Sequence, residues 1–429
     1  MKLAILSDTH IGDPASTLVK YVRGKAVCQP NMDHLIEALG TDNDYLILLG
    51  DIMEFSITDY YETYTCSSSF FGKLRDAGVA KEFIYVPGNH DYNIWDSIEQ
   101  QANVINQIRK GKSVRKYRHS VPFIVDDRPE KKECGSMLAG VKPSIGPHPY
   151  GGMFLDHMIP DNIHGTDNYV PFIVAYPNVY LLTEQNEVAL LTHGHYLESF
   201  WSATSTVYRA VKELDKNYSM KDFVAVNFPL CQLSATGLGQ SGPLTVTARK
   251  IQKDVKDGFF DDIRRYVHNI VKAIILVNIK LGRRIVGKVT DVLIFLFVRR
   301  MKRLRHSDYI TDIINNSKDH TERFDNFFNA SVMELKKLKK EYKQLHEINT
   351  QPDIFIFGHT HVPAPATDPK QYRYHKKPVK LINTGGWLET SASSCGGAVV
   401  HYETGKGFTS KVIDVKDVCC KGKINEYTF

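Results

Sequence analysis

The sequence predicts an α/β fold in which parallel strands alternate with helices and a helical insert interrupts the sheet domain. Short apolar runs typical of buried strands recur in the first half of the 429-residue chain and return near its end. Polar clusters rich in Asp and His follow these runs directly. A long basic stretch with helical periodicity separates the two groups. We therefore expect a discontinuous core of residues 1–196 and 350–415, an insert at 197–349 and a C-terminal tail at 416–429.

The first elements form the repeating unit of a parallel sheet. Residues 3–7, 45–49 and 83–87 are short apolar runs bounded by turn residues, as buried strands are. Between the first two, residues 31–39 carry apolar side chains at the i, i+3, i+4, i+7 spacing of a helix. The order strand, helix, strand predicts parallel neighbours in one sheet.

The later strands complete the core on either side of the insert. Residues 179–183 and 188–192 are separated by four polar or charged residues and predict a hairpin. Residues 354–357, 379–383 and 398–402 predict three more strands near the end of the chain. Ligands that follow such strands are expected to converge at one edge of a sheet.

The insert is amphipathic and basic. Residues 266–298 and 324–345 repeat apolar side chains every three or four positions, which predicts helices. Residues 250–305 hold 15 Lys and Arg against 5 Asp and Glu, a local net charge of +10 that leaves about −4 for the remainder. Charged side chains interrupt every apolar run before the roughly 18–20 residues that span a bilayer, which argues against a transmembrane helix.

Cysteine usage and the N-terminus favour a cytoplasmic protein. The 7 cysteines are scattered and odd in number, which does not suggest a disulfide framework. Residues 1–7 are too short for the apolar segment of a signal peptide and lead straight into Asp8. We expect a cytoplasmic location, with peripheral membrane binding through the basic stretch as one option.

Five short clusters carry the chemistry. They are Asp8-Thr9-His10, Gly50-Asp51-Ile52-Met53-Glu54, Gly88-Asn89-His90-Asp91, His193-Gly194-His195 and Gly358-His359-Thr360-His361. Alternate residues of an extended chain share a face, so Asp8 and His10 can hold one ion together. Asp51 can bridge two ions because a carboxylate has two oxygens, and Asn89 adds a neutral amide oxygen.

Mixed imidazole and carboxylate donors predict two divalent metal ions. His193, His359 and His361 complete a nitrogen and oxygen set that suits Mn²⁺, Fe or Zn²⁺ better than Ca²⁺, with Mn²⁺ expected first. Two ions about 3.5–4 Å apart lower the pKa of a bridging water and clamp both oxygens of an in-line displacement at phosphorus. His90 need not bind metal and could protonate the leaving oxygen, with Asp91 orienting its ring.

In this order the clusters resemble the five signature blocks of the calcineurin-like metallophosphoesterase superfamily. The resemblance implies a four-layer α/β sandwich of two mixed sheets and a binuclear site. It assigns Asp8, His10, Asp51 and His361 to one ion, and Asp51, Asn89, His193 and His359 to the other. It also implies that His90 and Asp91 form an acid dyad.

Single clusters have plainer readings. Gly50-Asp51 and Gly88-Asn89 alone are ordinary turn chemistry. His195 is either a substrate contact or a supporting residue, because the superfamily needs one His in that block. Glu54 either supports the site or hydrogen-bonds a loop. Residues 237–242 satisfy G-x-G-x-x-G, but Pro243 and β-favouring residues follow where a dinucleotide site needs a helix, so we interpret them as a loop.

The substrate is less well defined than the reaction. Protein phosphatases of the superfamily have Asp-Arg-Gly after the second block, where this chain has Glu54-Phe55-Ser56. The Gly-Asp-x-x-Glu and Gly-His-Thr-His-x-Pro forms are similar to UDP-2,3-diacylglucosamine pyrophosphate hydrolases, which also insert a basic, apolar helical cap. Two features depart from that subfamily: His90 stands where it usually has Arg, and this insert is much longer.

The resulting hypothesis is a binuclear metal-dependent phosphoester or pyrophosphate hydrolase. The basic stretch at 250–305 has three interpretations: an ordinary cap helix with solvated charges, a contact with an anionic membrane that admits a lipid-linked substrate, or a nucleic-acid contact. Its aliphatic content favours lipid over nucleic acid. The alternatives are a DNA or RNA phosphodiesterase and a non-catalytic scaffold that keeps the fold for binding.

Overall fold

The computed structural model describes most of the predicted core. The described residues are 1–129, 153–163, 165–198, 201–202, 204–205, 219–233, 318–361, 363–364, 373–374, 377–389, 396–414 and 424–428, together with scattered positions between 235 and 265. The predicted helix at 266–298 and most of residues 237–242 lie outside them, as does most of the basic stretch at 250–305.

The first sheet combines parallel strands from the N-terminal half with an antiparallel C-terminal edge. Its order is β17-β16-β15-β1-β4-β5-β7. The strands are β1 (Lys2–Leu6), β4 (Asn43–Leu49), β5 (Ala80–Val86), β7 (Phe172–Val174), β15 (Gly396–Glu403), β16 (Gly407–Asp414) and β17 (Ile424–Thr428). β1, β4, β5 and β7 run parallel, whereas β15 pairs antiparallel with β1.

The second sheet is also mixed and has the order β11-β14-β10-β9-β8-β6. Its strands are β6 (Phe123–Asp126), β8 (Asn178–Leu182), β9 (Val188–Thr192), β10 (Ile354–Phe357), β11 (Pro363–Ala364) and β14 (Lys380–Thr384). β9, β10 and β14 are parallel, and β8 and β9 form the predicted antiparallel hairpin. β8, β9 and β10 are buried along their whole length, as continuous apolar strands in a covered sheet should be.

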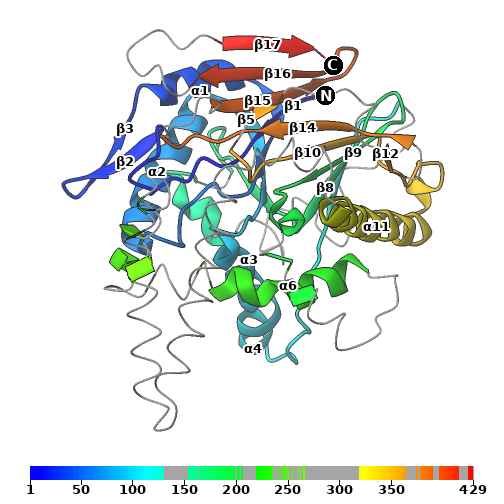
Figure 1. Ribbon diagram of the computed structural model, residues 1–429, viewed down its shortest axis with the longest axis horizontal. Coiled ribbons are helices and arrows are strands. Elements are labelled where there is room, and N and C mark those ends of the chain that lie inside the picture. Colours follow the sequence, from blue (N-terminus) through cyan, green and yellow to red (C-terminus); the bar gives the residue numbers. More distant parts are fainter. Residues whose placement is uncertain are drawn as a thin grey trace. The chain divides into compact units, whose positions relative to one another are not determined.

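The helices flank the two sheets, with α1 (Asn31–Leu39) and α2 (Tyr60–Asp76) beside the first sheet and α11 (Lys318–Glu341) beside the second (Figure 1). Further helices are α3 (Tyr92–Gln100), the π-helix η1 (Gln101–Ile105), α4 (Asn106–Arg109) and α6 (Met220–Gln232). Short 3-10 turns occur at η2 (Met153–Met158), η3 (His195–Leu197) and η5 (Lys343–Leu345), and small two-stranded sheets at β2 (Val19–Val22) with β3 (Lys25–Cys28) and β12 (Arg373–Tyr374) with β13 (Lys377–Pro378).

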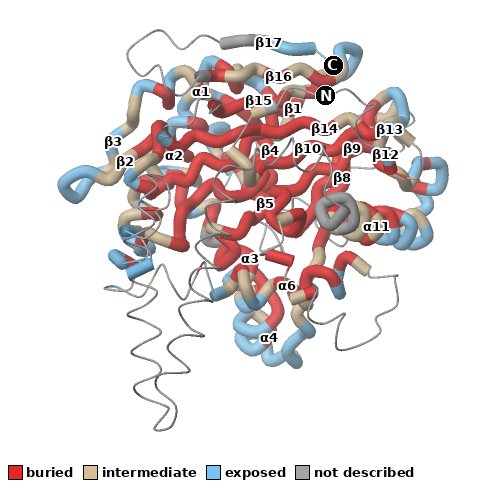
Figure 2. Tube along the Cα trace, in the orientation of Figure 1, coloured by how far each residue is buried: buried red, intermediate tan, exposed pale blue. Residues whose placement is uncertain are grey.

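The packing of rings shows which helix covers which sheet. Phe71 of α2 lies against Phe83 of β5, with ring centroids 6.2 Å apart. Phe324 and Phe328 of α11 both pack on Phe355 of β10, at 5.1 and 5.6 Å. The strands between these helices form the buried interior (Figure 2). Helices thus lie outside each sheet, which confirms the α/β class and agrees with the layered sandwich that the resemblance implied.

The two sheets adjoin at a close backbone contact just after β14. Gly385, directly after β14, forms an antiparallel bridge with Gly397 of β15. A Cβ atom on Gly397 would lie 2.1 Å from the Trp387 ring, which is fully buried. Only glycine fits at this point, so the indole fills the space where the strands of the two sheets meet.

The chain divides into two compact units, residues 1–240 with 316–429 and residues 241–315. Helices α6 and α11 fall inside the predicted insert at 197–349, yet both belong to the first unit, where α11 serves as a covering layer. The exact bounds of the insert stay a prediction. No helix in the described ranges is both long enough and apolar enough to cross a membrane.

Candidate metal centre

Five strand ends bring the five clusters together. β1, β4 and β5 are parallel neighbours in the first sheet and end just before Asp8, Asp51 and Asn89. β9 and β10 are parallel neighbours in the second sheet and end just before His193 and His359. The carboxyl ends of parallel neighbours lie at the same edge. We expected one sheet edge, but two sheets contribute: the His359 amide donates to Asp8 Oδ2 at 2.9 Å and so joins the loop after β10 to the loop after β1.

The loops that follow these strands have an uncommon backbone conformation. Five of the seven predicted ligands lie at positive φ: Asp8 (52°), His10 (43°), Asp51 (51°), His359 (70°) and His361 (58°). Non-glycine residues adopt this region rarely, at a cost on the order of 1–2 kcal/mol each. Backbone bonds hold the first of these loops, since the Asp8 and His10 amides donate to Gly50 and Asp51 carbonyls at 3.0 and 2.9 Å. Such clustered strain is typical of ligand-binding sites.

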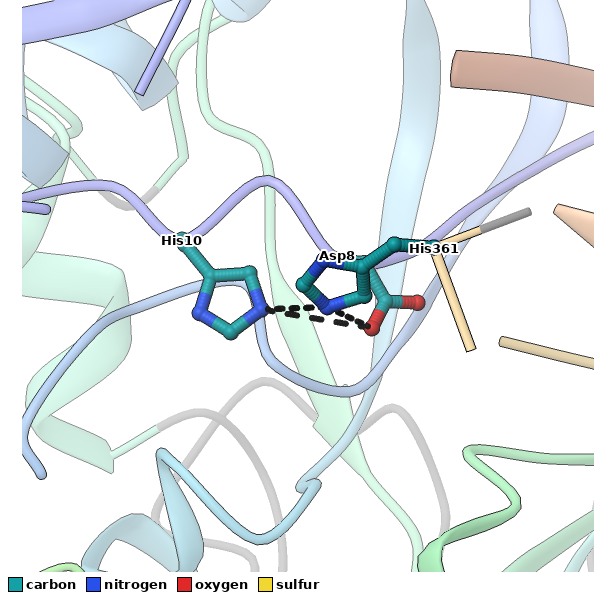
Figure 3. A group of neighbouring side chains, drawn as sticks. All are labelled: Asp8, His10 and His361. Atoms are coloured by element: carbon teal, nitrogen blue, oxygen red, sulfur yellow. Dashed lines mark hydrogen bonds and ion pairs between the residues drawn. The ribbon is translucent and has the colours of Figure 1, made fainter. Parts of the chain in front are cut away.

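Asp8, His10 and His361 form the first group of donors (Figure 3). The Nε2 atom of His361 lies 3.3 Å from Asp8 Oδ1 and 3.1 Å from His10 Nε2. His10 Nε2 is 4.0 Å from the same Asp8 oxygen. The three atoms therefore surround one point, and Asp8 and His10 are almost fully buried.

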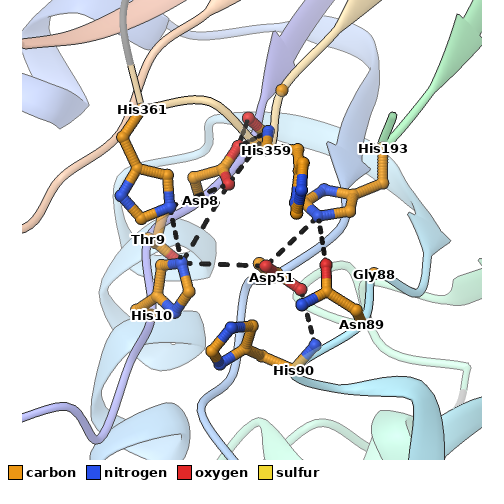
Figure 4. A network of polar contacts seen from close by, with 12 residues as sticks. Asp8, Thr9, His10, Asp51, Gly88, Asn89, His90, His193, His359 and His361 are labelled. Atoms are coloured by element: carbon orange, nitrogen blue, oxygen red, sulfur yellow. Dashed lines mark hydrogen bonds and ion pairs between the residues drawn. The ribbon is translucent and has the colours of Figure 1, made fainter. Parts of the chain in front are cut away.

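Asp51, His193 and His359 form the second group, with Asn89 beside them (Figure 4). His193 Nε2 lies 3.1 Å from Asp51 Oδ2 and 3.2 Å from Asn89 Oδ1. The His193 and His359 rings meet at right angles with centroids 5.2 Å apart. All four residues come from different loops, so a shared ligand would join these loops.

Asp51 stands between the two groups. Its Oδ2 atom lies 3.1 Å from His193 Nε2 and 3.8 Å from His10 Nε2, one nitrogen from each group. Burial alone would raise the pKa of Asp51, but His193 and His90 outweigh it and hold that pKa well below its usual range. The pKa of Asp8 is also lowered, since His193 and His361 outweigh the effect of burial. Both carboxylates are thus favoured in the anionic form that binds cations.

The donor set fits a pair of divalent ions. His193 Nδ1 lies 3.0 Å from the Leu49 carbonyl, and His10 Nδ1 lies 2.9 Å from a Glu54 oxygen. Each Nδ1 therefore carries a hydrogen, so when the ring is neutral the lone pair directed into the site is that of Nε2. His10 Nε2 faces His361 Nε2 at 3.1 Å as an acceptor, a contact that either a hydrogen on His361 or a cation between the two nitrogens would satisfy.

His90 lies next to these groups but is held by Glu54. Its Nδ1 atom is 2.7 and 2.9 Å from the two Glu54 oxygens, and its backbone amide donates to Asp51 Oδ1 at 2.8 Å. Burial opposes a charge on the ring, but Glu54 and Asp51 outweigh it and raise the pKa of His90 to about 10. Despite burial, His90 and His10 hold the pKa of Glu54 at about 2.

The prediction that Asp91 orients the His90 ring is wrong. The Asp91 carboxylate instead accepts hydrogen bonds from the backbone amides of Gly88 and Ile52, at 2.6 and 2.9 Å, and from the Tyr85 hydroxyl. Asp91 therefore ties the third loop to the second, while Glu54 takes the place beside the ring. The sequence does not indicate that Glu54 bonds the His90 ring, because Glu54 lies far from His90 in the chain whereas Asp91 is its direct neighbour.

His195 and Glu198 lie at the rim of the second group. The His195 ring is 5.4 Å from that of His193, and its Nε2 is 3.4 Å from the Tyr176 hydroxyl. Burial, then the charges of His193 and His359, lower the pKa of His195 well below its usual range. Glu198, which the sequence analysis missed, places Oε2 2.8 Å from His359 Nε2. The turn η3 brings it there, and no motif signals it.

A comparison with known families agrees with this geometry. Residues 1–198 match the family model described as calcineurin-like phosphoesterase. The match covers the first four clusters, whereas His359 and His361 lie beyond it. A search of curated proteins found no significant match. The matched domain and the donor groups support a metal-dependent phosphoesterase.

Proposed function

We propose that the chain is a binuclear metal-dependent hydrolase of phosphoesters or phosphoanhydrides. Asp8, His10 and His361 would hold one divalent ion, Asn89, His193 and His359 the other, and Asp51 both. The observation that supports this most is the position of Asp51 Oδ2, within 4 Å of one imidazole nitrogen from each group. Mn²⁺ is our first choice of metal, with Fe and Zn²⁺ as alternatives, because the donors are nitrogen and oxygen without sulfur.

When bound, the two metal ions would act as Lewis acids and stabilise the charge that develops on the phosphoryl oxygens and on the attacking water. The protein's part is to hold the donors rigidly. Asp8 accepts the His359 amide at 2.9 Å, so the fifth loop is tied to the first. Glu198 accepts from His359 Nε2, which leaves the Nδ1 lone pair of that ring for the ion.

His90 is the proposed acid for the leaving oxygen. Glu54 accepts its Nδ1 hydrogen, and the ring is 22% exposed whereas Glu54 is fully buried. The Nε2 hydrogen of a charged ring is therefore the one left to face a substrate. Glu54 also accepts from His10 Nδ1, so one carboxylate positions both a metal ligand and the acid.

The proposed substrate class is inferred from the sequence patterns of the five clusters. The block patterns favour a phosphodiester or pyrophosphate, including a lipid-linked one, over a phosphoprotein. The basic stretch at 250–305 that suggested an anionic membrane lies mostly outside the described residues, and this part of the proposal rests on its composition.

Metal removal and reconstitution test the proposed activity. The full chain is stripped with a chelator, reconstituted with Mn²⁺, Fe²⁺ or Zn²⁺, and assayed with bis(p-nitrophenyl) phosphate, aryl monoesters, nucleotide-sugar lipids and oligonucleotides. We expect activity that disappears on stripping and returns with metal. Metal binding without hydrolysis of any substrate in this panel would instead support a non-catalytic scaffold, and cleavage of oligonucleotides alone would support a nuclease.

A further inference from the structure

A second surface of the molecule combines exposed aliphatic and basic side chains. We call residues 104–118 the α4 projection; they comprise the end of η1, all of α4 and the segment that returns from it. Its tip is exposed to solvent (Figure 2). From residue 101 to residue 125 the sequence contains six Lys and Arg and no Asp or Glu. The cations are Arg109, Lys110, Lys112, Arg115, Lys116 and Arg118, and all six are exposed.

Large aliphatic side chains accompany these charges. Val104, Ile105 and Ile108 are 39%, 38% and 62% exposed, and Val114 is 57% exposed. The first three lie at i, i+1 and i+4 and so share one face of the helix. Isolated exposed aliphatics are normal, but four within one short segment form a patch.

Hydrogen bonds hold the α4 projection in a defined conformation. The Arg115 amide donates to the Asn103 carbonyl at 2.9 Å, which ties the return segment to η1. The Lys112 amide donates to the Gln107 carbonyl at 2.9 Å, and the Arg118 amide donates to a buried Glu99 oxygen at 2.8 Å. The cations and aliphatics are therefore held on one defined segment.

Five of the six cations of the α4 projection have no acidic partner within the part of the chain that the structure describes. None of Arg109, Lys110, Lys112, Arg115 and Lys116 forms an ion pair with a described acidic residue. A partner that matches both features must offer anionic groups and a place to bury aliphatic side chains. Nucleic acid supplies the first of these, whereas the surface of an anionic bilayer supplies both.

We propose that the α4 projection is a docking surface for an anionic lipid membrane, with its cations on the headgroups and Val104, Ile105, Ile108 and Val114 at the acyl boundary. The continuous helical segment from Tyr92 to Arg109 begins directly after the Asn89 cluster and ends at this surface. At about 1.5 Å per residue it spans roughly 25 Å, so the proposed surface lies within about that distance of the Asn89 cluster. The proposal concerns where the protein works and does not depend on the proposed function.

Vesicle sedimentation with the full chain tests this surface. Phosphatidylcholine vesicles with phosphatidylserine should bind the protein, and vesicles without it should bind far less, with added salt weakening the binding. Each cation near such a surface multiplies partitioning by about fivefold, so the triple variant Arg109→Gln, Lys110→Gln, Lys112→Gln should lose about 100-fold. Ile108→Ser with Val114→Ser should also lose at least tenfold, since it removes the buried aliphatics at unchanged charge.

The matched control removes three cations elsewhere. Lys336, Lys337 and Lys340 are exposed on α11, and their replacement by Gln lowers the net charge equally. This variant should keep wild-type vesicle binding. The proposal fails if the wild type does not bind anionic vesicles, or if both triple variants bind alike. It also fails if the aliphatic variant binds normally while the α4 triple variant loses affinity for oligonucleotides, because the surface would then be a nucleic-acid site.

Discussion

Two clusters in the first compact unit hold buried or partly buried carboxylates, and their neighbours differ. In the metal centre, imidazole nitrogens surround Asp8 and Asp51. On α11, Glu334 accepts hydrogen bonds from three neutral groups of the described residues: Ser120 at 2.5 Å, Tyr180 at 2.8 Å and Asn178 at 3.2 Å. The pKa of both aspartates is lowered, whereas burial, only partly offset by these hydrogen bonds, raises that of Glu334.

The neighbours of these carboxylates distinguish a binding site from a structural contact. Both Glu334 oxygens accept from neutral donors among the described residues, so no cation is needed to satisfy them. Around Asp8 and Asp51 the neighbours are ring nitrogens, several of which direct lone pairs toward the same space as the carboxylates. Such a cluster is complete only when positive charge lies within it. The comparison predicts that changes in the metal centre alter metal content and activity, and that changes at Glu334 alter stability alone.

The largest effect is expected from Asp51→Asn. An amide cannot supply negative charge to two ions, and loss of several kcal/mol of charge stabilisation corresponds to about 1,000-fold or more in kcat/KM. Metal analysis by mass spectrometry should show fewer bound ions per chain. Glu334→Gln is the matched isosteric control and should retain full metal content. Unchanged metal content in Asp51→Asn would remove the basis for a bridging role.

His90→Asn is expected to have the next largest effect. Loss of a general acid costs about 100- to 10,000-fold. The loss should be large for an alkyl leaving group and small for p-nitrophenolate, which leaves without a proton. Metal content should stay at the wild-type level. Equal losses on both substrates would mean that His90 acts through the structure of the site and not as an acid.

Glu198→Ala should weaken metal binding by about 10- to 100-fold, the usual effect of removing a carboxylate that orients a ligating histidine. Glu198→Gln keeps an acceptor for His359 Nε2 and should recover part of the affinity. Competition titration with a chromophoric chelator measures both. Glu347→Ala, at an exposed position, is the control. Equal affinity in wild type and Glu198→Ala would show that His359 needs no such partner.

The smallest effect concerns the stability of Glu334→Gln. Because the folded pKa of Glu334 is raised, its favourable contribution is complete below the unfolded pKa and is lost as pH rises through the folded pKa. Gln does not titrate. The unfolding free energy of the variant relative to wild type should therefore rise as pH increases from below the unfolded pKa to above the folded pKa. Urea titrations across this range measure it, with Glu341→Gln on the same helix as the exposed control. A constant difference would contradict the comparison.

Sequence patterns were sufficient for the strands that deliver ligands. Residues 31–39 and 354–357 match α1 and β10 in full, because continuous apolar runs and helical spacing reflect burial directly. Helix α2 was missed because Thr63, Cys66 and Ser67 share its buried face with phenylalanines and blur the apolar pattern. Strand β16 and the edge strand β17 were also missed, since polar side chains interrupt the apolar pattern in both.

The residues of the candidate site were also predicted only in part. All seven predicted ligands lie in the two donor groups or beside them, because each follows a strand and strand ends converge. The partners of His90 and His359 could not be predicted, since Glu54 and Glu198 reach them through loop geometry that leaves no periodic signal. Side chains that touch across loops are set by tertiary packing.

Electron paramagnetic resonance of the Mn²⁺-loaded full chain tests the central claim most directly. Two ions that share the Asp51 carboxylate should give the exchange-coupled signal of a Mn²⁺ pair at two equivalents of metal. Asp51→Asn should reduce this to the signal of isolated ions or abolish it, while Glu334→Gln should leave it intact. A wild-type protein that binds one ion, or two ions without coupling, would contradict the account.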